Sequence, residues 1–83
     1  MRVRDDVSAV RTEYGTVLLD ERQGRYFKLS PTAGVVFDAL RGGGSAEDAV
    51  AALRRNYAVD EQRARSDVDS LVERLAAMGV LRR

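Results

Sequence analysis

The chain contains no cysteine and no histidine. Without cysteine it has no disulfide, no thiol nucleophile and no thiolate ligand for a metal. Without histidine it lacks the usual general base, the commonest metal ligand and the Ser-His and Cys-His arrangements of nucleophilic catalysis. Only carboxylate sites remain, and the adjacent pair Asp5-Asp6 would point to opposite faces of a strand. We therefore expect no catalytic residues, no metal and no cofactor.

Long apolar runs and an excess of one charge are also missing. No segment approaches the roughly 20 apolar residues of a membrane span, and the N-terminal MRVRDDV lacks the apolar centre of a signal peptide. The net charge is +1 with 33% charged residues, which is typical of a soluble surface and not of a polyanion binder. We expect one cytoplasmic domain over residues 1–83, with no membrane or nucleic-acid partner.

The first third of the chain, from about residue 3 to residue 29, has the sequence patterns of β-strands. Val3–Thr12 carries scattered apolar residues among charges and predicts a weak strand. Thr16–Asp20 and Arg25–Leu29 are richer in β-formers, and a turn at Glu21–Gly24 separates them. Together they predict an antiparallel sheet of three strands.

The strand Arg25–Leu29 is the first candidate binding element. Period two places Phe27 and Leu29 on one face, which is first of all a core face, and Tyr26 and Lys28 on the other. If the strand lies at a sheet edge, its unpaired N–H and C=O groups can template an added strand. The charged residues either protect that edge or contact an acidic ligand, and the sequence alone does not separate the two.

The rest of the chain predicts three helices over residues of about 31–79. Ser30-Pro31 is a strong helix start, Ser45–Asp48 resembles a capping box, and Asp60 can cap the third helix. Gly79 ends that helix, after which Val80-Leu81 can pack back on the core. Three strands followed by three helices indicate an α+β fold.

The third helix argues against DNA binding. Three helices with a small sheet could form a winged helix, whose third helix would need a basic surface to enter the major groove. The stretch Asp60–Gly79 carries five acidic and three basic residues, a net charge of −2. Phosphates would repel such a helix, so a winged-helix DNA-binding module is only a rival interpretation.

One flank of the same helix is the second candidate binding element. Arg63, Asp67, Ser70 and Arg74 follow the spacing i, i+4, i+7, i+11 and form one strip beside the apolar stripe. The strip is either a solvated face with local ion pairs, each worth about 0.3–0.5 kcal/mol, or the polar rim of a groove that receives a peptide. The pattern itself favours the solvated face.

Two stretches resemble a known family. The run Val17–Leu40, which includes YFKLSPTA at residues 26–33, is similar to the PqqD-like family of RiPP recognition elements. The C-terminal run with Asp67-Val68, Leu71, Leu75 and Gly79–Leu81 is similar too. These domains bind the leaders of ribosomally made, modified peptides, and a freestanding chain of this size resembles most the leader-binding protein of lasso peptide clusters.

The resemblance implies a fold and a site. The fold would be winged helix-turn-helix-like, with a three-stranded antiparallel sheet followed by three helices. A leader peptide would add as a strand to Arg25–Leu29 and lie against the third helix, over a pocket floored by Val68 and Leu75. The peptide-binding residues implied are Arg25, Tyr26, Phe27, Lys28, Leu29, Asp67, Val68, Ser70, Leu71, Arg74 and Leu75.

The function that follows is that of a non-catalytic adaptor. It would bind the precursor's leader and present it to a separate leader peptidase, which the lasso resemblance implies is a transglutaminase-like cysteine protease. An ATP-dependent macrolactam synthetase would act afterwards. A PqqD-type peptide carrier in cofactor biosynthesis shares the fold and the binding mode, and it remains the main alternative.

Overall fold

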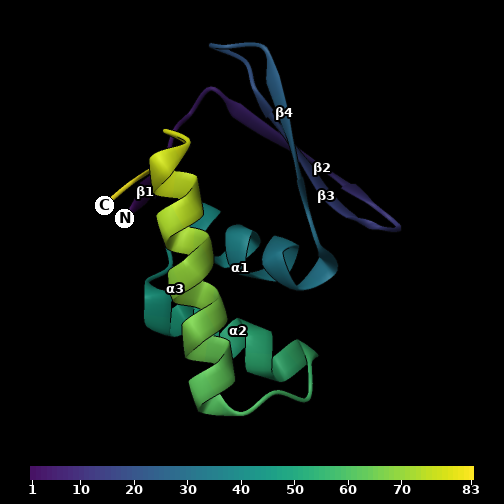
Figure 1. The fold of residues 1–83 in the computed structure, drawn as a ribbon, viewed down its shortest axis with the longest axis vertical. Helices are drawn as coiled ribbons and strands as arrows, with labels where there is room; N and C mark the ends of the chain where they lie inside the picture. The colour runs from purple at the N-terminus through teal and green to yellow at the C-terminus, as the bar shows by residue number, and fades with distance from the viewer.

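An antiparallel sheet of three strands precedes three helices, which confirms the predicted α+β order (Figure 1). The computed structural model describes residues 1–83. The three-stranded sheet has the order β2-β3-β4, and a separate pair joins the two ends of the chain. The elements are β1 (Arg2–Val3), β2 (Val7–Thr12), β3 (Gly15–Asp20), β4 (Arg25–Leu29), α1 (Pro31–Arg41), α2 (Ala46–Asn56), α3 (Glu61–Ala77) and β5 (Leu81–Arg82).

The prediction of one strand over Val3–Thr12 is wrong. The segment forms two strands, β1 and β2, and only β2 joins the three-stranded sheet. The break comes at Arg4, because its side chain turns into the protein to pair with Asp6 and Asp20. Strand β1 pairs instead with β5, which the sequence did not predict as a strand.

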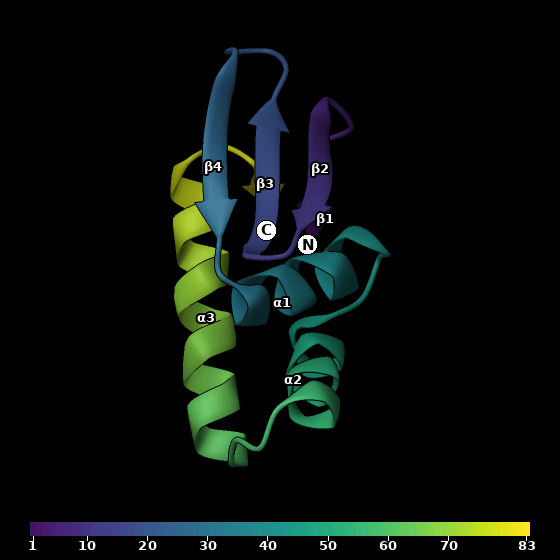
Figure 2. The ribbon, with the colours of Figure 1, turned by 90° about the vertical axis from the view of Figure 1, so that its right-hand side faces the viewer.

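The helices lie against one face and one end of the sheet, and the other face carries no helix (Figures 1 and 2). Leu18 stands on the covered face opposite Ala9 and Phe27 and is fully buried. Its neighbours Val17 and Leu19 point to the open face and are half-buried. The alternation predicted for β3 and β4 is therefore present, with one side in the core.

The helices begin where the sequence predicts. The Ser30 hydroxyl accepts a hydrogen bond from the backbone N–H of Ala33 at 3.2 Å, and Pro31 follows as the first residue of α1. Both bonds of the capping box at the start of α2 are present. Asp60 caps α3 with one bond only, to the N–H of Arg63. Each cap satisfies a donor that a helix start leaves unpaired.

Two glycines let β4 and α1 approach β3 closely. A Cβ at Gly15 would lie 2.0 Å from the carbonyl oxygen of Leu29, and one at Gly34 would lie 2.6 Å from Oγ1 of Thr16. Gly15 is limited to glycine because the contact is with backbone and its φ is +142°. A side chain at Gly34 would require the buried Thr16 hydroxyl to move. These close approaches hold the end of β4 and the start of α1 against β3.

The core lies between the sheet and the three helices. Its largest fully buried side chains include Leu18 from β3, Phe37 and Leu40 from α1, Leu53 from α2 and Leu75 from α3. Burying side chains of this size stabilises each by about 1.5–3 kcal/mol relative to exposure.

None of the three helices combines the length and the apolar character that crossing a membrane requires.

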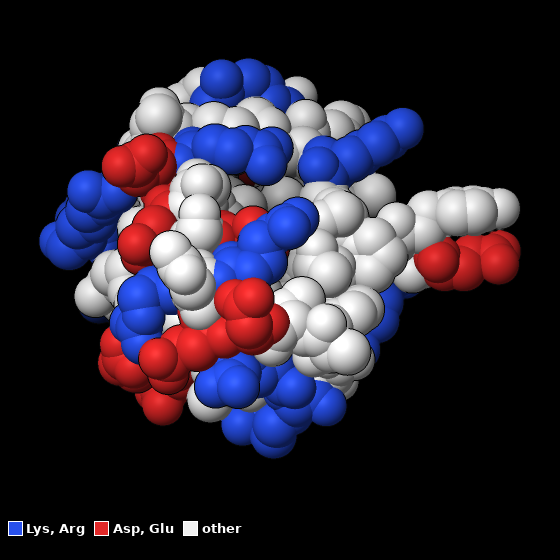
Figure 3. Space-filling model, turned by 60° about the horizontal axis from the view of Figure 1, so that its bottom comes forward, with Lys and Arg blue, Asp and Glu red and all other residues white.

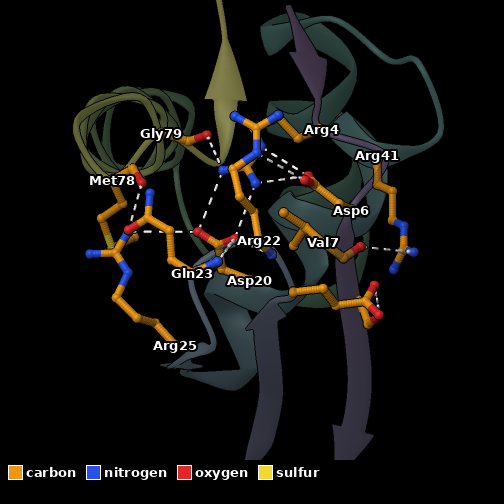
Figure 4. A network of polar contacts seen from close by, with 12 residues as sticks. Arg4, Asp6, Val7, Asp20, Arg22, Gln23, Arg25, Arg41, Met78 and Gly79 are labelled. Atoms are coloured by element: carbon orange, nitrogen blue, oxygen red, sulfur yellow. Dashed lines mark hydrogen bonds and ion pairs between the residues drawn. The ribbon is translucent and has the colours of Figure 1, made fainter.

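One buried carboxylate joins segments that are far apart in the sequence. Asp20, at the end of β3, is 0% exposed and receives two hydrogen bonds from the Arg4 guanidinium, at 3.1 and 3.4 Å (Figure 4). The backbone N–H groups of Arg22 and Gln23 donate to the same carboxylate. Arg4 also donates to the carbonyl of Gly79 at 2.9 Å, just beyond the end of α3.

These hydrogen bonds change the acidity of the groups involved. The bonds from Arg4 lower the pKa of Asp20 below its ordinary value, in spite of burial, and the N–H groups of the turn lower it further. Arg4 also lowers the pKa of Asp6 by hydrogen bonding. Both carboxylates are therefore ionised at neutral pH and compensate the buried part of Arg4.

We expect Asp20→Asn to lower the melting temperature at pH 7 by about 10 °C, because it leaves the largely buried Arg4 guanidinium with Asp6 as its only carboxylate partner. Thermal unfolding followed by circular dichroism measures the shift. Asp5→Asn is the matched control, since Asp5 is exposed and pairs only with Arg2. It should shift the melting temperature by no more than a few degrees.

The same pair predicts how stability depends on pH. Because the folded-state pKa of Asp20 is lowered, its stabilisation is present above about pH 4 and is lost as the pH falls through that lowered pKa. The melting temperature should therefore fall between about pH 5 and about pH 2 more steeply in the wild type than in Asp20→Asn. Equal slopes in the two proteins would contradict this role of Asp20.

Candidate functional site

Strand β4 lies at an edge of the sheet. It pairs with β3 on one side, and no strand pairs with it on the other. In an antiparallel sheet the N–H and C=O groups of successive residues point alternately to the two neighbouring strands. Half of the main-chain groups of β4 therefore point away from the sheet.

The ladder between β2 and β3 shows which groups these are. The N–H of Glu21 donates to the carbonyl of Asp6 at 2.9 Å, one step beyond the pair Val7↔Asp20. By alternation, Leu19 and Val17 also bond to β2, and the residues between them bond to β4.

The β3 residues that bond to β4 are opposite Arg25, Phe27 and Leu29. Tyr26 and Lys28 therefore direct their N–H and C=O groups outward at the open edge. Their side chains are exposed on the open face of the sheet, as period two predicts.

The opposite edge of the sheet is partly covered. By the same alternation, the backbone groups of Val7, Ala9 and Arg11 on β2 point away from β3. Arg41 of α1 donates to the carbonyl of Val7 at 3.4 Å, and Arg11 forms an ion pair with Asp38 of α1. Long charged side chains beside a strand hinder edge-to-edge pairing. The edge of β4 is the more accessible of the two.

A hollow of about 280 Å³ lies at the end of this open edge. It is smaller than the typical small-molecule pocket of about 300–1,000 Å³, so it suits one or two side chains. Its floor is apolar and its rim is polar, and the residues come from α1, α2 and α3. The lining residues are Ser30, Thr32, Ala33, Val36, Leu53, Arg63, Asp67, Ser70, Leu71 and Arg74.

The structure brings four of the predicted helix residues together at the hollow. Asp67, Ser70, Leu71 and Arg74 line it, and so does Arg63 from the strip identified in the sequence. Arg63 also pairs with Asp67 at 3.4 Å. The strip therefore contains a local ion pair, as expected for a solvated face, and it also forms the polar rim of the hollow.

Two predicted residues lie deeper than expected. Val68 and Leu75 are fully buried in the core, and neither lines the hollow. Leu71, on the same stripe, is 4% exposed and does line it. Val68 and Leu75 can therefore support the floor only from beneath.

The other end of the space between β4 and α3 is closed by Arg25. Its guanidinium donates to the carbonyl of Met78 at 3.2 Å and lies 3.6 Å from the Asp20 carboxylate. The same group sits over the ring of half-buried Phe27, 5.1 Å from its centroid. Arg25 thus connects the start of β4 to the end of α3, and it leaves the hollow at the opposite end accessible.

Sequence reasoning missed the contribution of α1 and α2. Ser30, Thr32 and Ala33 lie where α1 begins, directly after β4. The Ser30-Pro31 signal could have suggested this, because a helix that starts at the end of an edge strand must place its first turn there. Nothing local marked Leu53, whose helical pattern predicts only that it faces the core.

The carboxylates of the chain form no metal site. No group of three or more Asp, Glu, His or Cys side chains lies close enough to hold a metal ion. Asp5 and Asp6 lie in a turn and not on a strand, and each pairs with arginine. On the helical end of the molecule, basic and acidic side chains are interspersed (Figure 3).

The fold and the site define a small winged-helix-like α+β domain that presents one open strand beside an apolar hollow. Residues 15–81 match the family described as coenzyme PQQ synthesis protein D (PqqD). The chain belongs to this PqqD family, and its resemblance to PqqD-like RiPP recognition elements is confirmed. No curated protein matches it.

Two solved structures share the fold over almost the whole chain. TbiB1 in complex with the TbiA(beta) leader peptide is 27% identical, with a TM-score of 0.87, and the match covers 98% of this chain and 94% of that one. Lasso peptide synthetase B1 complexed with the leader peptide is 37% identical, with a TM-score of 0.80, and the match covers 94% and 92%.

Neighbouring residues of α3 should differ sharply in their effect on stability. Leu75→Ala should lower the free energy of unfolding by about 2–5 kcal/mol, because it leaves a cavity in the core. Arg74→Ala should change it by no more than about 0.5 kcal/mol, because its side chain is on the rim. Urea unfolding measures both changes, provided that the dependence of the free energy of unfolding on urea concentration is the same in each variant. A large loss of stability in Arg74→Ala would show that this rim residue is needed for the fold.

Proposed function

We propose that this chain is a non-catalytic adaptor that binds the leader of a ribosomally synthesised precursor, of the lasso peptide class, by β-strand addition. The observation that carries the proposal is the open edge of β4 directly beside the hollow. The fold is shared with two proteins whose structures contain leader peptides. The hollow begins at Ser30, the residue that directly follows β4.

The edge supplies affinity with little sequence preference. The leader's main chain can form hydrogen bonds with the main chain of Tyr26 and Lys28, and these bonds do not depend on the leader's side chains. Leader residues opposite Phe27 and Leu29 then point inward toward α3, and the residues between them point to the open face. A leader that orders on binding loses chain entropy, which offsets part of this gain.

The hollow supplies selection. Its floor of Ala33, Val36, Leu53 and Leu71 accepts an apolar leader side chain, and its polar rim excludes water around that contact. An interface near the low end of roughly 800 Å² per partner suits a nanomolar-to-micromolar complex. Such a complex can still release the leader for turnover.

Leader removal is assigned to another protein. The chain has no histidine and no cysteine, so the nucleophile and base of a cysteine protease must come from a separate chain. We infer that the adaptor presents the bound leader to a transglutaminase-like leader peptidase in the cytoplasm. An ATP-dependent macrolactam synthetase would then act on the released core.

The family match supports a second candidate. A PqqD-type carrier in cofactor biosynthesis would use the same edge and hollow for a different peptide. The bound peptide distinguishes the two functions, because their folds and binding modes are the same. The 37% identity to a lasso peptide synthetase B1 is why we favour the lasso class.

The direct test is a titration of the purified chain with the synthetic leader of the precursor encoded beside its gene. We expect a dissociation constant of roughly 10⁻⁹–10⁻⁶ M by calorimetry. The precursor's core segment without its leader serves as the control and should not bind. Absence of leader binding at tens of micromolar would rule out the adaptor function.

The mode of binding is tested by a pair of substitutions at one residue. Tyr26→Pro removes an outward N–H without breaking a bond to β3, because proline is tolerated at an edge whose N–H faces solvent. Tyr26→Ala removes the same side chain and keeps the N–H. We expect Tyr26→Pro to bind the leader about tenfold more weakly than Tyr26→Ala, since a main-chain bond is lost.

Circular dichroism should show that both Tyr26 variants remain folded. Phe27→Pro is the contrasting control, because Phe27 bonds to β3 and its loss should destabilise the sheet itself. Equal leader affinity in Tyr26→Pro and Tyr26→Ala would show that the leader does not add as a strand to β4.

A further inference from the structure

The two sides of the proposed groove carry positive charges that the protein itself does not neutralise. Lys28 on β4 and Arg74 on α3 take part in none of the ion pairs of the chain. Both side chains are exposed. The two other cations of the groove, Arg25 and Arg63, have carboxylate partners in Asp20 and Asp67.

The groove is more positive than the rest of the surface. Arg25, Lys28, Arg63 and Arg74 contribute +4, and the partners of Arg25 and Arg63, Asp20 and Asp67, contribute −2, which gives a net +2. The whole chain is +1, so the remaining residues sum to −1. A local excess of one sign attracts ligands of the opposite sign and raises their association rate.

The two unpaired cations lie toward the hollow end of the groove. The Arg25 guanidinium, which lies over the Phe27 ring, donates to the carbonyl of Met78. Arg74 lies one helical turn before Met78, about 6 Å along α3, and it lines the hollow together with Ser30, which directly follows β4. Strand β4 and helix α3 run in opposite directions (Figure 2), so Arg74 lies toward the end of β4, the half of the strand that carries Lys28.

The cations face opposite sides of the position that a docked strand would occupy. Arg74 lines the hollow, on the inner side. Lys28 pairs with Val17 and shares its open face of the sheet, on the outer side. Successive side chains of an added strand point alternately to these two sides. No single residue of the peptide can therefore meet both cations, whereas two residues of opposite orientation can.

Resting on the proposed function, we propose that the docked peptide carries two acidic side chains an odd number of positions apart. One faces inward to Arg74, and the other faces outward to Lys28. Apolar side chains at other inward positions fill the hollow. The peptide must then carry acidic side chains as well as the apolar side chains that fill the hollow. A neutral or basic strand of the same length would bind more weakly.

The test uses a displayed library of random 12-residue peptides, selected on the purified chain and eluted with salt. We expect Asp or Glu to be enriched at two positions an odd number apart. The same selection on the Lys28→Ala/Arg74→Ala double variant should lose that enrichment and keep the apolar one. Arg55→Ala is the matched control, because Arg55 is an exposed, unpaired arginine of α2 outside the groove.

Affinities of one selected peptide then separate the two sites. Replacing either acid by its amide should weaken binding by about two- to fivefold, as expected for an exposed ion pair. The loss should disappear in the variant that lacks the matching cation. Arg74→Glu should in turn prefer a peptide with lysine in place of the inward acid.

Each outcome decides between the proposals. Binders without paired acids, acids an even number apart, or enrichment unchanged in the double variant would overturn the electrostatic requirement and leave strand addition intact. Selected peptides whose affinity does not differ between Tyr26→Pro and Tyr26→Ala would overturn strand addition as well. Failure to select any binder would overturn both.

Discussion

The pairing of Arg4 with Asp20 joins the sheet to the end of the third helix. It connects the start of the chain, the turn between β3 and β4, and the backbone just after α3. Arg25 adds a second connection from β4 to the same end of α3. Because both connections lie at one end, β4 and α3 are held together there, and the space at their other end stays accessible. The buried ion pair therefore helps to hold the two walls of the groove, β4 and α3, in place.

Local signals predicted the fold, and long-range contacts were the part that sequence patterns missed. Ser30, Ser45 and Asp60 each act within three residues, so their capping roles were visible in the sequence. Arg4 meets a partner sixteen residues away, and nothing in its neighbourhood marks it as a buried side chain. The pairing of β1 with β5 joins opposite ends of the chain, so no periodicity could reveal it.

The site shows the same division. Asp67, Ser70 and Arg74 share a helical strip, and the family resemblance selected the groove interpretation of it. Leu71 and Leu75 share one apolar stripe, and the family resemblance placed both at the peptide, with Leu75 in the floor of the pocket. The structure separates them, because the hollow opens above one turn of α3 and not above the next. Where a hollow opens depends on how α1 and α2 pack, which no single segment encodes.

The short length of β4 affects how long a bound peptide stays on the protein. Its open edge exposes two residues, which offer at most four main-chain bonds, each worth about 0.5–1.5 kcal/mol net. An arbitrary extended peptide that meets only this edge gains too little to offset the entropy of its own ordering, so it leaves quickly. A peptide that also fills the hollow stays longer. The brevity of the strand thus acts as a kinetic filter against the many unrelated extended chains in a cell.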